Sequence, residues 1–119
     1  MEKVRKATEQ LIEAMKESDV YIRYQNARVQ ITACPSLKKE ADEFRKKNYD
    51  LQNSRKDIFE EADRLQAEYA TLLKNPIVRE YLTAENSFCR MIQQVNWKLI
   101  EEMDFEADFE GKRKDSETD

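Results

Sequence analysis

The chain has 119 residues, a length that accommodates one domain and not two. Charged residues make up 39% of it and hydrophobic residues also 39%, and its 25 acidic and 21 basic side chains leave a net charge of −4. Histidine is absent, which excludes histidine-activated nucleophiles and histidine-ligated zinc or haem. The one glycine, Gly111, lies near the C-terminus, which excludes a glycine-rich phosphate-binding loop.

The hydropathy pattern and the cysteines indicate the cellular compartment in which this protein is found. No run of about 18 apolar residues exists, so we expect no membrane span, and the N-terminus lacks the apolar segment of a secretory signal. Cys34 and Cys89 are too few for a disulfide framework, and we expect free thiols in a reducing cytoplasm. Cys89 should pack as a small hydrophobe, while Cys34, at a predicted helix break, should be more exposed.

The first third of the chain predicts two helices, about 3–17 and 19–33, with a tight break between them. Ser18 and Asp19 lie at the break, where either can cap the second helix. The apolar residues recur at spacings of three and four, as they do on one face of a helix. They are Val4, Ala7, Leu11, Ala14 and Met15, followed by Tyr21, Tyr24, Ala27 and Ile31.

The two prolines predict two further helix starts. Proline fits the first helical position, since the N–H that it lacks would have no partner there. We therefore expect helices to begin near Pro35 and at Pro76. Asn75 is a good N-cap for the second of these helices, whereas Cys34 is a poor cap for the first.

Residues 35–74 allow two interpretations. The apolar pattern keeps a single helical register throughout, so one continuous helix of about 40 residues is compatible with it. Alternatively, the polar run 52–57 forms a turn between two antiparallel helices, because Asn53, Ser54 and Asp57 are capping or turn residues. The hairpin is favoured, since a chain of this length must fold back to bury its apolar faces. The pattern consists of Leu37, Ala41, Phe44, Asn48, Leu51, Ile58, Ala62, Leu65, Tyr69 and Leu72.

The predicted last helix, from Pro76, has an unusually wide apolar face. At about 100° per residue its apolar side chains cover an arc of roughly 180°, whereas an ordinary surface helix needs a stripe of about 100°. We therefore expect either the central helix of a bundle or a helix that also forms an oligomer interface. The candidate interface residues on this face are Tyr81, Leu82, Glu85, Phe88, Ile92, Val95, Asn96 and Leu99.

The order of these landmarks resembles the YlbF/YmcA family of bacterial cell-fate regulators, which act in competence, sporulation and biofilm formation. The resemblance covers about residues 7–109, and no single motif carries it alone. The matching segments are LIEAMKES with Tyr21 and Tyr24, PSLKK leading to DEFR, NPIVREYL with Ala84 and Glu85, and CRMIQ with Val95 and Asn96.

The resemblance implies an all-α protein without enzymatic activity that assembles with itself or with relatives. We expect a small antiparallel helical bundle built on a long helical hairpin, with one domain over 1–104 and an acidic flexible tail over 105–119. Some members of the family influence messenger-RNA processing by a ribonuclease, and some of their complexes hold iron–sulfur clusters on cysteines. Two cysteines cannot supply the four thiolates of such a cluster, so no cofactor or metal is expected here.

Two polar residues, Glu85 and Asn96, interrupt the apolar arc of the last helix. A buried carboxylate costs several kcal/mol unless it is paired. One interpretation is a device that sets register or partner choice, as polar residues do in coiled coils. The other is a simple ion pair of Glu85 with a nearby arginine, for which the candidates are Arg23, Arg28 and Arg45.

Trp97 lies opposite the apolar arc, on a side of the helix that also carries Arg90 and Arg79. A tryptophan beside arginines is a reasonable anchor for a protein partner, and these three residues are the candidate partner-binding site. The alternative is that another helix covers Trp97, or that Phe105 and Phe109 of the tail do so.

The middle of the chain is locally basic, but acidic residues interrupt the run. A solvated helix face explains this pattern better than a nucleic-acid surface, and we do not expect direct nucleic-acid binding. The function predicted is that of a cytoplasmic, non-enzymatic regulator or adaptor that associates with itself, with YlbF/YmcA-like relatives and with other partners. The alternative is an accessory subunit of RNA processing that modulates a ribonuclease, directly or through a partner. The basic residues are Lys38, Lys39, Arg45, Lys46, Lys47, Arg55 and Lys56.

Overall fold

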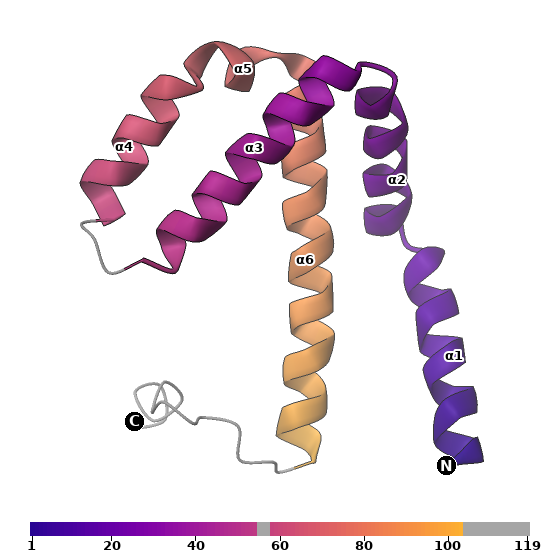
Figure 1. Cartoon of the computed structure of the whole chain (residues 1–119). Helices are drawn as coiled ribbons and strands as arrows, with labels where there is room; N and C mark the ends of the chain where they lie inside the picture. The colour runs from indigo at the N-terminus through magenta and orange to yellow at the C-terminus, as the bar shows by residue number, and fades with distance from the viewer. Residues whose placement is uncertain (55–57, 104–119) are drawn as a thin grey trace. The chain divides into compact units, whose positions relative to one another are not determined.

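The computed structural model describes residues 1–54 and 58–103. Within these ranges it contains six helices and no strand, which confirms the all-α prediction (Figure 1). The predicted acidic tail lies outside the described residues. The helices are α1 (Glu2–Lys16), α2 (Asp19–Thr32), α3 (Pro35–Gln52), α4 (Ile58–Glu68), α5 (Ala70–Lys74) and α6 (Pro76–Glu102).

The helix starts follow the predicted capping chemistry. The hydroxyl of Ser18 accepts a hydrogen bond from the backbone N–H of Tyr21 at 3.2 Å, which satisfies one free donor of α2. The side-chain oxygen of Asn75 accepts one from the N–H of Ile77 at 2.9 Å at the start of α6. Pro35 occupies the first turn of α3, as expected.

The hairpin interpretation of the middle segment is confirmed. Side chains that follow α3 bond back to its last turn: the amide of Asn53 donates to the carbonyl of Tyr49 at 2.8 Å, and the hydroxyl of Ser54 donates to that of Leu51 at 2.9 Å. The next helix, α4, runs back beside α3 (Figure 1), and the two helices are in contact. The continuous 40-residue helix is therefore excluded.

A second break, at Tyr69, interrupts the apolar repeat that spans 58–72. The backbone of Tyr69 has φ −107° and ψ 21°, outside the ideal helical range, and separates α4 from α5. The ring of Tyr69 packs edge-on against Phe44 of α3, with centroids 5.4 Å apart. Leu65 before the break and Leu72 after it are both buried in one cluster, so the bend is compatible with burial on both sides.

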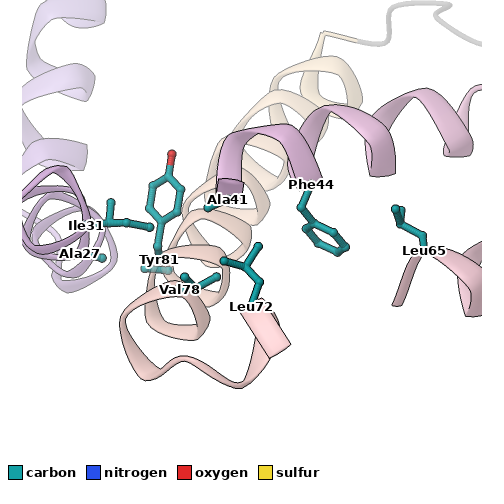
Figure 2. Close-up of a cluster of buried hydrophobic side chains, with 9 residues drawn as sticks. Ala27, Ile31, Ala41, Phe44, Leu65, Leu72, Val78 and Tyr81 are labelled. Carbon is teal, nitrogen blue, oxygen red and sulfur yellow. The ribbon is translucent and has the colours of Figure 1, made fainter. Parts of the chain in front are cut away.

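One hydrophobic cluster collects residues from α2 to α6 (Figure 2). Three of its members are alanines, and small side chains at a contact let helix axes approach closely. The cluster consists of Ala27 and Ile31 (α2), Ala41 and Phe44 (α3), Leu65 (α4), Leu72 (α5), and Val78, Tyr81 and Ala84 (α6).

The contacts divide the chain into two compact units, Met1–Phe88 and Cys89–Asp119. The hydrophobic cluster lies wholly within the first unit, to which α6 contributes its first half. Of the second unit, the structure describes residues 89–103. These residues are the second half of α6 and the one residue that follows it. The prediction of one domain over 1–104 stays a prediction.

Candidate functional site

The first four candidate interface residues of α6 are engaged within the Met1–Phe88 unit. Tyr81 is only 3% exposed in the hydrophobic cluster, and Leu82 packs partly buried against it. The ring of Phe88 stacks on Tyr24 of α2 at a centroid distance of 5.0 Å. Glu85 is half-buried and bonds to an arginine of α3, as described below. The apolar arc of this half of α6 therefore contributes to the core of the chain itself.

Polar groups of α3 and α6 form a network at the edge of the core. The Tyr81 hydroxyl donates to the carboxylate of Asp42 at 3.2 Å. Asp42 also accepts from Arg45 at 2.9 Å and from the Lys38 ammonium. Arg45 in turn donates from its Nε to Glu85 at 2.9 Å, and a second nitrogen donates to the other oxygen of the same carboxylate. Glu85 thus has Arg45 as its ion-pair partner, one of the three arginines that the sequence offered.

The pKa values of three groups in this network, Asp42, Tyr81 and Arg45, are shifted away from neutral pH. Burial tends to raise the pKa of the Asp42 carboxyl, but hydrogen bonds from Lys38 and Arg45 outweigh it and hold that pKa below its usual value. Burial raises the pKa of the Tyr81 phenol. The hydrogen bond to Glu85 raises the pKa of Arg45. An acid–base catalyst needs a pKa near the working pH, and these shifts lead away from it. The network is therefore suited to joining two helices.

The other four candidates lie on the second half of α6, where the apolar face is largely exposed. Ile92 is 44% exposed and Leu99 is 50% exposed. Val95 is half-buried, and Asn96 is exposed. All the buried residues of α6 belong to its first half. The wide apolar arc that the sequence shows is therefore core at one end of the helix and surface at the other.

The candidate partner-binding residues are exposed. Trp97 and Arg90 line a shallow hollow on the second half of α6, together with Gln93, Gln94, Lys98 and Glu101. Trp97 is partly covered, and it lies about 160° around the helix from Tyr81. Arg79 is exposed on the first half of the same helix. The possible cover by Phe105 and Phe109 lies outside the described residues.

Sequence reasoning missed two features of the Met1–Phe88 unit. Arg23 of α2 donates two hydrogen bonds to the carboxylate of Glu80 of α6, at 2.7 and 2.8 Å. This bidentate pair holds the pKa of Glu80 below its usual value, chiefly through the hydrogen bond. In addition, α1 buries none of its residues, although its apolar spacing is as regular as that of the other helices. Spacing shows that a helix has an apolar face, and it carries no signal of what covers that face.

The basic residues of α3 are spread among acidic partners. Besides the pairs of Lys38 and Arg45, Lys46 bonds to Asp50 at 3.3 Å and Lys47 bonds to Glu68 of α4 at 3.1 Å. Such pairs neutralise the positive field that a nucleic-acid phosphate would need. Arg55 and Lys56 lie outside the described residues.

The expected exposure of the two cysteines is wrong in its order. Cys89 is exposed and Cys34 is half-buried, and both are free thiols. Cys89 lies at the edge of the apolar arc, just beyond the last residues of α6 that reach the core. Residues 1–54 and 58–103 bring together no group of three Cys, Asp or Glu that could hold a metal ion. Across the same residues, no helix is both long and apolar enough to cross a membrane.

These observations define a helical protein that exposes apolar side chains on α1 and on the second half of α6. The family described as "Control of competence regulator ComK, YlbF/YmcA" matches residues 4–104, and the chain belongs to this family. The description of the family is regulatory, which agrees with the role that the sequence predicts. It does not name a partner or an assembly.

A similar protein provides a second comparison. The chain is 26% identical over 110 residues to a "UPF0342 protein" of Caldicellulosiruptor bescii, in an alignment that covers 86% of this chain and 89% of that protein. That name states no activity. No solved structure matches the chain.

Proposed function

We propose that this protein is a cytoplasmic, non-enzymatic regulatory adaptor that associates with itself through the second half of α6. One observation carries the proposal: the apolar face of this half, with Ile92, Leu99 and Met103, is exposed while the first half of the same helix is core. An exposed contiguous apolar patch marks an interaction site. Burying one large apolar side chain stabilises an assembly by about 1.5–3 kcal/mol.

The opposite side of the same helix segment supports the binding of a second protein. Trp97 and Arg90 are of the residue types that dominate the energetics of protein interfaces. Because the two faces point in different directions, self-association leaves the Trp97 side accessible to a partner. The identity of that partner would distinguish the two candidate functions. An RNA-processing accessory subunit would bind a ribonuclease, whereas a regulatory adaptor would bind another protein.

The test is the sedimentation of the full chain at tens of micromolar. We expect the wild type to sediment as a dimer or larger species, and Ile92→Glu and Leu99→Glu to shift it to the monomer. Gln94→Glu, on the opposite side of α6, is the matched control and should sediment like the wild type. Because Ile92 and Leu99 are exposed, the variants should keep the helix content measured by circular dichroism.

A folded wild-type monomer at these concentrations would contradict self-association. If both glutamate variants remain as associated as the wild type, the second half of α6 is not the surface through which the chain associates.

A further inference from the structure

α1 carries a second exposed apolar face. Its apolar residues lie on one side of the helix, yet none of its residues is buried, and Val4 is 57% exposed. The face also includes Leu11, which is exposed, and Met15, which is half-buried where α1 meets α2. An amphipathic helix gains its stability mainly from covering such a face. We therefore expect another surface to cover the apolar face of α1.

The exposed faces of α1 and of the second half of α6 match in spacing and length. In α1 the apolar residues follow one another at three, four and three positions, and in α6 at three, four and four. Spacings of three and four form the seam along which two helices interlock side chains. Each seam is about 15 Å long at 1.5 Å per residue. The residues are Val4, Ala7, Leu11 and Ala14 in α1, and Ile92, Val95, Leu99 and Met103 in and just after α6.

The charges along these two segments are complementary in one direction only. Residues 2–6 of α1 hold three basic residues and one acidic residue, a net +2. Residues 7–17, which are the rest of α1 and its C-cap Glu17, hold three acidic and one basic, a net −2. In the second half of α6, residues 89–98 hold two basic residues, a net +2, and 99–102 hold two acidic residues, a net −2. An antiparallel alignment places opposite charges together at both ends. A parallel alignment places like charges together at both ends, which is unfavourable.

We propose that α1 of one copy of this chain packs antiparallel on the second half of α6 of a second copy. Two-fold symmetry repeats the contact, so that both exposed faces of both copies become buried. This inference rests on the self-association proposed above. It adds the surface that α6 meets, which is α1 of the partner copy and not a second α6.

Disulfide trapping tests the pairing in the full chain. Cys34 and Cys89 are first replaced by serine. Two copies with different tags are then co-expressed, one with Leu11→Cys and the other with Val95→Cys. Because each copy carries a single thiol, a disulfide that joins the two tags must link two different copies of the chain. We expect oxidation to produce a species of twice the chain mass that carries both tags.

Two further pairs test orientation and face. Val4→Cys should link to Met103→Cys, as the antiparallel alignment requires, and should fail to link to Ile92→Cys. Glu13→Cys with Gln94→Cys places both thiols on the polar sides of the two helices, and this pair should give no doubled mass. The matched failures show that a positive result reports proximity and not random collision.

Other outcomes overturn the inference, and they do so separately from the proposed function. If copies with Val95→Cys link to one another and not to Leu11→Cys, α6 meets α6, and self-association stands while the α1 pairing fails. Leu11→Glu should dissociate the assembly as completely as Leu99→Glu does, and an undisturbed assembly would also refute the pairing. A monomeric wild type refutes both proposals.

Discussion

At the residue scale, the Asp42 carboxylate shows how a partly buried charge is retained between helices. Burial disfavours the charged form, but hydrogen bonds from Lys38, Arg45 and the Tyr81 hydroxyl compensate for it. The sequence suggested three arginines as partners of Glu85, and local spacing could not distinguish them. Arg45 is the partner because the register between α3 and α6 places it beside Glu85, and that register is a property of the fold.

The depressed pKa of Asp42 predicts a specific pH dependence of stability. Because the folded pKa lies below the unfolded one, the network stabilises the fold above the unfolded pKa of about 3.9 and loses this contribution as pH falls through the folded pKa. We expect Asp42→Asn to be less stable than the wild type at pH 7, with the difference shrinking as the pH falls below the unfolded pKa. Urea unfolding at pH 7 and at acidic pH measures this difference in stability. Asp63→Asn, at an exposed position of α4, is the control, and an equal pH response in both variants would contradict the role of Asp42.

At the scale of single elements, the chain is organised by local start and stop signals. Ser18, Pro35 and Asn75 occupy the helix starts that their chemistry predicts, and α3 ends at Gln52, where the polar run begins. The break at Tyr69 has no such signal, because tyrosine is an ordinary helix residue and the repeat continues through it. At this bend the ring of Tyr69 packs on Phe44 of α3. No local sequence pattern encodes that contact.

The cap of α6 predicts a measurable local cost. Asn75→Ala removes the acceptor for the N–H groups of Ile77 and Val78, and we expect a loss of about 1 kcal/mol of unfolding free energy. Asn86→Ala, at an exposed interior position of α6, is the matched control. It should be neutral or slightly stabilising, because alanine has the higher helix propensity. Equal losses in the two variants in urea unfolding would show that the cap contributes nothing specific.

At the scale of the molecule, the buried cluster of the Met1–Phe88 unit and the exposed faces beyond it have different roles. The cluster draws on five helices, so its residues are separated by long stretches of chain. Residues outside it, on α1 and the second half of α6, have equally regular apolar spacing but remain exposed. Mutations in the two groups should therefore affect different measurements, stability in the first and association in the second.

Two neighbouring positions of α2 allow a direct comparison of a buried and an exposed apolar side chain. Ile31 is 0% exposed and Val29 is 72% exposed, although they are two residues apart. We expect Ile31→Ala to cost about 2–5 kcal/mol of unfolding free energy. Val29→Ala should change it by no more than about 0.5 kcal/mol. Chemical denaturation of both variants measures the difference, and similar costs would mean that the cluster is not the stabilising core.

The sequence by itself determined the helical class, the helix starts at Ser18, Pro35 and Asn75, and the face of each helix that is apolar. These features depend on backbone chemistry and on the 3.6-residue period, both of which act within a few residues. Only the tertiary structure decided which apolar faces are covered, which arginine pairs with Glu85, and where the chain bends at Tyr69. Covering a face requires side chains that lie far apart in the sequence, so one apolar stripe along α6 is core in its first half and exposed surface in its second.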